Sequence, residues 1–298
     1  MTTMKNFSTR TRRGWSYLLL ISAVLVLGAC SMIRVAYNNG ESLGYWWLDN
    51  YVDFSPEQGP WVKARIHSLF DWHRRTQITD YIALLQEGQK QLQQSPDKAK
   101  LLSDMHEMRK RSTLILEQAV PDMADLALSL RPQQITNIEK EFASGNKEYT
   151  KKYLRGNLEH QQQSRFKKVL EQAEFWFGDF SREQEKAIHV LADAAPSNNE
   201  RYYQARLQRQ QDIVALLKKI QTERPSRDQT IRLLRDFTVA QVDYPGGQEF
   251  HSFIDAYNDG LAGLSAAVIM LTTPAQKAHA NMKLQQFIED FRVLSIQR

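Results

Sequence analysis

The chain has 298 residues, 42% of them hydrophobic and 24% charged, enough to bury the core of one large domain or two small ones. Its 39 basic and 34 acidic side chains give a net charge of +5, but residues 1–29 hold four of the basic side chains and no acidic one, so the rest carries +1. That balance lacks the basic footprint of a nucleic-acid-binding protein. A single cysteine leaves no partner for a disulfide within the chain.

Residues 1–29 have the three parts of a secretory signal. A basic segment precedes an apolar run over residues 15–27, and the small residues Gly28 and Ala29 precede Cys30. The apolar run is shorter than the roughly 20 residues that a membrane-spanning helix needs. The pattern predicts cleavage between Ala29 and Cys30 and attachment of acyl chains such as palmitate to Cys30. The alternative is an uncleaved helix that lies in the membrane interface.

Acylation of Cys30 would hold the mature chain on a membrane, because each buried CH₂ contributes about 0.8 kcal/mol. The cysteine is followed by Ser31 and not by aspartate. By resemblance to sorted lipoproteins, this residue favours the periplasmic face of the outer membrane over the inner membrane. The membrane, reached through acylated Cys30, is therefore the first expected partner.

After the signal, apolar residues recur three and four positions apart, as at Leu284, Phe287, Ile288 and Phe291. This spacing is typical of amphipathic helices. We predict an all-α protein, an elongated bundle of about nine helices. Their expected ranges are 32–51, 56–94, 97–129, 132–177, 182–195, 198–223, 227–243, 248–271 and 274–296. Residues 30–54 form the lipidated N-terminus and an aromatic-rich first helix, and residues 55–298 form a single helical domain.

Four helix starts share the pattern of a capping box, with a serine or threonine at the first position and a glutamine three residues later. In one of them an arginine replaces the hydroxyl residue, and in three a proline stands at the second position. They stand at residues 55–58, 131–134, 181–184 and 273–276. Residues 80–85 also resemble residues 212–217. Together these similarities suggest two repeated halves, 55–179 and 180–298. The alternative is that amphipathic helices share such residues by composition alone.

Two resemblances to known families follow from these motifs. The string from Asn38-Asn39 through Trp46-Trp47-Leu48-Asp49 to Pro56-Glu57-Gln58 resembles a family of proteobacterial lipoproteins that has no assigned activity. The four glutamine-containing starts are similar to the Leu-Thr-x-x-Gln repeats of Spy-type periplasmic chaperones. That second resemblance implies an all-helical fold that cradles unfolded clients.

Aromatic residues gather in the first predicted helix, at Tyr45, Trp46, Trp47 and Tyr51. They are candidates for contact with a partner protein or with lipid head groups. The competing interpretation is that their helical spacing packs them into the core. A second candidate contact is Trp176, near the end of a long basic helix. The alternative there is a buried helix end with Gly178 as its C-cap.

No motif indicates catalysis, a cofactor or a metal site. The seven histidines have no spacing typical of zinc ligands. Carboxylates such as Asp122 and Asp125, or Asp255 and Asp259, are paired as on many helix faces. Basic runs, among them Lys147 to Arg155, are either solvated helix faces or contacts for anionic lipid head groups and lipopolysaccharide phosphates.

We therefore expect a non-enzymatic component of the cell envelope that binds a protein partner or client, as a chaperone or as a scaffold. Two alternatives remain. An enzyme on envelope lipids or glycans would need a pocket in which histidines and carboxylates converge. A carrier of an apolar ligand would need an apolar cavity between helices.

Overall fold

The computed structural model describes residues 32–195 and 198–297, so the predicted signal and the cleavage site at Ala29 and Cys30 lie outside the described residues. The described part is all-α, as the periodicity predicts, with eleven α-helices and no strand. The helices are α2 (Met32–Val52), α3 (Gln58–Thr76), α4 (Ile78–Gln91), α5 (Lys98–Ser129), α6 (Pro132–Tyr149), α7 (Leu158–Phe177), α8 (Arg182–Ala194), α9 (Asn199–Glu223), α10 (Arg227–Asp243), α11 (His251–Leu271) and α12 (Pro274–Ile296). Two short segments complete them, the π-helix η1 (Thr150–Leu154) and the 3-10 helix η2 (Gln248–Phe250).

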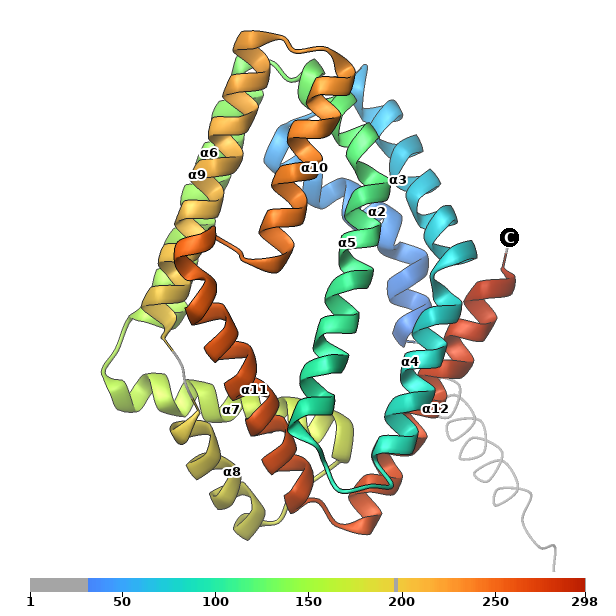
Figure 1. The fold of residues 1–298 in the computed structure, drawn as a ribbon, viewed down its shortest axis with the longest axis vertical. Helices are drawn as coiled ribbons and strands as arrows, with labels where there is room; N and C mark the ends of the chain where they lie inside the picture. Colours follow the sequence, from blue (N-terminus) through green and yellow to red (C-terminus); the bar gives the residue numbers. More distant parts are fainter. Residues whose placement is uncertain (1–31, 196–197, 298) are drawn as a thin grey trace, which may run out of the picture.

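The helices form an elongated frame (Figure 1). One long edge is the pair α6 and α9, and the other is built from α3, α4 and α12, with α4 against α12. Between the edges, α5 packs against α10 and α11, while α7 and α8 pair at one end. Helices distant in the chain therefore lie side by side across the whole frame.

Two predicted helices are divided, which is why eleven are present where nine are expected. The range 56–94 breaks at Gln77, whose backbone (φ −106°, ψ −28°) departs from ideal helix geometry. The range 132–177 changes to a π-helix at Thr150 and ends at Arg155, where the chain becomes extended. Gly156 then takes a φ of +97°, and the Asn157 side chain caps α7 by accepting from the His160 N–H at 2.9 Å. A glycine at positive φ beside an asparagine cap therefore separates η1 from α7, although the apolar period continues through this segment.

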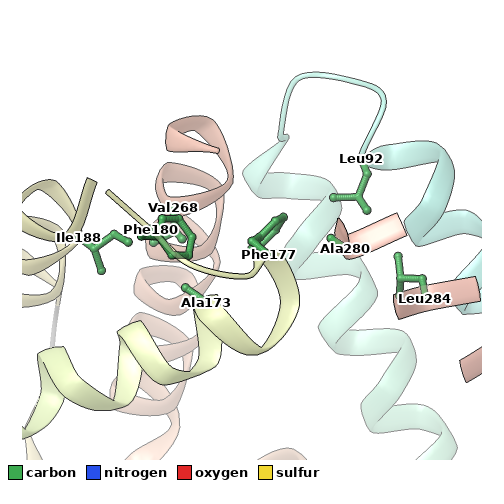
Figure 2. Packing of buried hydrophobic residues seen from close by; sticks show 8 residues of the cluster. All are labelled: Leu92, Ala173, Phe177, Phe180, Ile188, Val268, Ala280 and Leu284. Atoms are coloured by element: carbon green, nitrogen blue, oxygen red, sulfur yellow. The ribbon is translucent and has the colours of Figure 1, made fainter. Parts of the chain in front are cut away.

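The core consists of several apolar clusters, the largest at the end where α7, α8, α11 and α12 meet. Figure 2 shows its buried members, with Phe177 and Phe180 at the C-terminal end of α7 and Ile188 and Val268 beside them. Gly178 is the C-cap of α7 at φ +75°, as predicted. Leu92, just after α4, and Leu284, on α12, extend the cluster across the frame. This packing fixes the end of α7 within the core.

No helix of the described chain combines the length and apolar character that crossing a bilayer requires.

Candidate functional site

The first helix, α2, presents large apolar side chains to solvent. Exposed fractions are 58% for Val35 and Leu43, 63% for Trp46 and 56% for Trp47. Their spacing of eight, three and one residues places them along one side of the helix. Exposed tryptophans on one helix face make this surface a candidate interaction site.

The same face of α2 carries no charge. The three charged residues of α2 have partners elsewhere: Arg34 pairs with Asp290 of α12 at 2.7 Å, and Glu41 lies 3.0 Å from Nδ1 of His67 on α3. Asp49 accepts from the Phe54 N–H at 3.0 Å, in the loop that follows α2. The remaining exposed side chains are those of Val35, Ala36, Asn38, Asn39, Ser42, Leu43, Trp46, Trp47 and Asn50. We call this set the α2 outer face. In a chain with 24% charged residues, an uncharged exposed face on a whole helix sets α2 apart.

The other predicted contact residues lie inward. Tyr45 packs against Phe54 with ring centroids 5.8 Å apart, and Tyr51 packs edge-on against Phe142 at 5.7 Å. Trp176 packs edge-on against Phe287 at 5.6 Å, beside the large core cluster. Of the five candidate aromatic residues, only Trp46 and Trp47 are more than half exposed, and the other three are half-buried.

The four glutamine-containing helix starts meet in two pairs. In the first pair, Gln134 Nε2 donates to Gln58 Oε1 at 2.7 Å and to the Asp53 carbonyl at 3.1 Å. Gln58 Nε2 donates to the Ser129 carbonyl at 3.3 Å, and each Oε1 also accepts the backbone N–H at its own helix start. We call this reciprocal arrangement a glutamine clamp. It joins the start of α3 to the start of α6.

The second glutamine clamp repeats the bonds between the two amides and from each amide to a backbone carbonyl. Gln184 Nε2 donates to Gln276 Oε1 at 2.9 Å and to the Leu271 carbonyl at 2.7 Å, while Gln276 Nε2 donates to the Asp179 carbonyl at 2.7 Å. It joins α8 to α12. All four glutamine side chains are therefore engaged in hydrogen bonds within the fold.

A signal for the clamps is present in the sequence, although the helix-start pattern alone does not reveal it. Residues 53–58 read Asp-Phe-Ser-Pro-Glu-Gln and residues 179–184 read Asp-Phe-Ser-Arg-Glu-Gln. The spacing of 126 residues relates Gln58 to Gln184 and also relates the accepting carbonyls of Asp53 and Asp179. A search for repeated six-residue strings would find one half of each clamp, the half that holds Gln58 or Gln184.

The titratable groups are dispersed, each with its own neighbours. His189 lies 3.7 Å from Asp193 and His251 lies 3.4 Å from Asp255, both within single helices. The suggested carboxylate pairs separate into ion pairs between helices: Asp125 binds Arg227 at 2.6 Å, and Asp259 binds Lys98 at 2.6 Å. Within the described residues, no group of three or more histidine, cysteine or acidic side chains is placed to hold a metal ion.

Two surface pockets are lined mainly by polar side chains. One of about 490 Å³ lies between α9 and α10, where Lys219, Glu223 and Arg232 contribute charges of both signs. The other, of about 370 Å³, lies beside η1 and is lined by Lys147 and Arg155 with no acidic side chain. Neither has the apolar lining expected of a carrier of apolar ligands.

The fold and the site together define a class: an all-helical protein held by two glutamine clamps, with an uncharged aromatic face on its first helix. Residues 50–239 match a family of unknown function, DUF6279, and the chain belongs to that family. No curated protein and no solved structure matches the chain.

Proposed function

We propose that this protein is a lipid-anchored component of the cell envelope that rests on the periplasmic face of the outer membrane through α2. The rest of its helical surface binds a protein partner without catalysing a reaction. The observation that carries the proposal is the α2 outer face, with Trp46 and Trp47 exposed and no charged residue among the exposed side chains of α2.

Chain geometry links that face to the predicted anchor. Cys30 precedes Met32, the first residue of α2, by two residues, and two residues span at most about 7 Å. Acyl chains on Cys30 would therefore bring the start of α2 to the membrane surface. Tryptophans favour the head-group region, because the ring is apolar and its N–H can still bond to polar groups.

Fluorescence quenching tests the membrane contact. The acylated protein would be purified from membranes and reconstituted into vesicles whose phosphatidylcholine carries bromine on its acyl chains. Bromine quenches only tryptophans that reach the lipid. We expect quenching in the wild-type protein and in Trp61→Phe/Trp72→Phe, and loss of quenching in Trp46→Phe/Trp47→Phe.

The control pair Trp61 and Trp72 is half-buried on α3 and removes the same number of indole rings. Equal quenching in both double variants would overturn the role of the α2 outer face. Mass spectrometry of the same preparation tests the anchor separately. A mature chain that begins at Met1 and carries no acyl mass would contradict lipidation at Cys30.

The protein-binding role has a chaperone form and a scaffold form. Since the glutamines of the four helix starts bond to each other and to backbone carbonyls, they are not free to bind clients. We favour the scaffold form for that reason. An aggregation assay with an unfolded client decides between them: suppression at stoichiometric amounts would support the chaperone form instead.

We also infer that the chain arose by internal duplication. The two glutamine clamps use equivalent residues, and the helices around them correspond, with α2 and α3 matching α7 and α8. The similar segments 80–85 and 212–217 provide Leu85 and Leu217. Leu85 is half-buried against the cluster that contains Phe177, and Leu217 is half-buried against the cluster that contains Ile135. These equivalences favour repeats that begin at α2 and α7, upstream of the boundaries 55 and 180.

A further inference from the structure

The junction of α6, η1 and α9 is the most irregular part of the helical frame. Five residues, Thr150–Leu154, form a π-helix, a rare conformation that often marks functional sites. The first turn of α9 supports it: Asn199 Nδ2 donates to the Tyr153 carbonyl at 3.2 Å, and the Asn199 carbonyl accepts from the Tyr149 hydroxyl at 3.3 Å. The irregular backbone is thus held by hydrogen bonds to the start of the adjacent helix α9.

Beside this junction lies the pocket of about 370 Å³. One side of α6 supplies Ala143, Asn146 and Lys147, and Thr150, the first residue of η1, follows them at helical spacing. Tyr203 of α9 forms the opposite wall, with its ring stacked on Tyr149 at 5.4 Å and 13°. Arg155, where the chain leaves η1, completes the lining.

The pocket lining carries two positive charges, those of Lys147 and Arg155. In the part of the chain that the structure describes, neither Lys147 nor Arg155 forms an ion pair with a carboxylate. A third cation, Arg206, is fixed near the same wall: its Nε donates to Asn146 Oδ1 at 2.9 Å, and its guanidinium lies 5.9 Å from the Tyr149 ring. Gly145 permits this approach, because a Cβ there would stand 3.1 Å from the guanidinium.

We propose that this pocket binds a phosphate group, with Lys147 and Arg155 as its charged ligands and the Thr150 hydroxyl as a further donor. Arginine and lysine form strong charge-assisted hydrogen bonds to phosphate oxygens. The Tyr203 ring forms a wall on which a sugar or glycerol attached to that phosphate can pack. The site is separate from the α2 outer face and does not rest on the function proposed for it.

The first arm of the test is calorimetric titration of the full-length protein with inorganic phosphate, at ionic strength held constant with chloride. The variant Lys147→Gln/Arg155→Gln removes both pocket charges. Its matched control, Lys151→Gln/Lys152→Gln, removes two exposed charges of the same segment that do not line the pocket. We expect the pocket variant to weaken binding by at least about tenfold and the control to change it by less than about twofold.

The second arm measures binding to vesicles of phosphatidylcholine with and without phosphatidic acid, using the same two variants. Pocket-dependent binding of free phosphate would identify a soluble phosphorylated ligand, and pocket-dependent binding of phosphatidic acid alone would identify a lipid head group. Either result supports the site. Equal losses in the two variants would mean diffuse attraction to a basic segment and would overturn the proposal, as would phosphate binding in neither arm.

Retention of fold is checked by circular dichroism and thermal melting of each variant. Failure of this site leaves the tryptophan quenching of α2 unaffected, so the two proposals fail independently.

Discussion

Gln276 shows how much one side chain contributes to this fold. It is 9% exposed, its Oε1 accepts the Thr273 N–H, and its Nε2 donates to the Asp179 carbonyl. Gln276→Leu keeps the volume but leaves those two backbone groups without this partner and removes the hydrogen bonds that Gln276 shares with the Gln184 amide. Unsatisfied buried groups cost about 1–3 kcal/mol each, partly relieved by water. We expect urea denaturation to give a free energy of unfolding lower by about 2 kcal/mol.

The matched control is Gln204→Leu, which removes an exposed glutamine bonded only to Glu200 one turn earlier. Its effect should stay within about 0.5 kcal/mol. The double variant Gln184→Leu/Gln276→Leu should cost less than the two single variants together, because each single change already breaks the hydrogen bonds between the two amides. Strict additivity would show that the clamp is not a coupled unit.

His73 predicts a pH dependence of stability. It is half-buried on α3, its Nδ1 lies 3.0 Å from the Tyr37 hydroxyl, and the Tyr81 ring is 5.4 Å away. Burial lowers the pKa of the His73 imidazole below its usual value near 6.5. The unfolded chain therefore binds a proton more readily than the native one, so this contribution to stability is present above about pH 6.5 and is lost as the pH falls towards the native pKa.

Denaturation series at several pH values measure that slope. Between about pH 7.5 and about pH 5, the wild-type protein should lose more stability than His73→Gln, which cannot titrate but keeps a hydrogen-bonding group. His160→Gln, which removes an exposed imidazole at the start of α7, should follow the wild-type curve. Identical slopes for wild type and His73→Gln would refute the assignment.

Among the helical elements, the break between η1 and α7 depends on one backbone conformation. Gly156 has a φ of +97°, and a Cβ there would lie 2.9 Å from the His160 ring. We expect Gly156→Ala to lower the free energy of unfolding by about 1–2 kcal/mol. Gly44→Ala is the matched control, since Gly44 is within α2 and a Cβ there meets no atom within 4 Å. That change should raise stability by about 0.5–1 kcal/mol.

Thermal melting of the two variants gives the comparison directly, with shifts of opposite sign. A neutral or stabilising Gly156→Ala would mean that the chain can bridge η1 and α7 in an ordinary conformation, and that the break is not set by this glycine.

How far the sequence predicts these elements depends on the kind of signal. Helical class, the helix starts and the C-cap at Gly178 follow from local chemistry, namely side-chain period, capping glutamines and a residue tolerant of positive φ. The break at Gln77 has no such signal, because no glycine or proline marks it and the apolar period continues. Tertiary packing against α5 and α12 decides that boundary.

The candidate site divides in the same way. Trp46 and Tyr45 are neighbours in sequence, yet the first is 63% exposed and the second packs against Phe54. Neighbouring residues on a helix point about 100° apart, so the exposure of each side chain depends on which side of α2 meets α3, α6 and α12. That choice is made by long-range contacts. The pocket at η1 is likewise beyond sequence reasoning, since it joins residues of α6 and α9 through a π-helix.

At the scale of the whole molecule, the two proposed repeats, which begin at α2 and α7, pack closely against each other. The apolar clusters mix them: Val120 and Ala124 of α5 pack with Ile220 of α9 and Leu234 of α10, and Leu92 packs with the α7 and α12 cluster. Helix α4 lies on α12, and α9 lies on α6. Each repeat therefore contributes to cores that the other shares, although the buried members of the clusters around Ile135 and around Phe250 come from one repeat each.

This arrangement predicts that the chain cut at the exposed junction after Gly156 folds only as a complex. Fragment 1–156 would expose the faces that α4 and α5 bury against the second repeat, and burying each large apolar side chain contributes about 1.5–3 kcal/mol. We expect circular dichroism of either fragment alone to show reduced helix content without a cooperative melt. Mixing fragments 1–156 and 157–298 should restore both, and a tag on one fragment should capture the other. Independent cooperative melting of the separate fragments would contradict the interlocked core, because each would then have buried enough apolar surface without its partner.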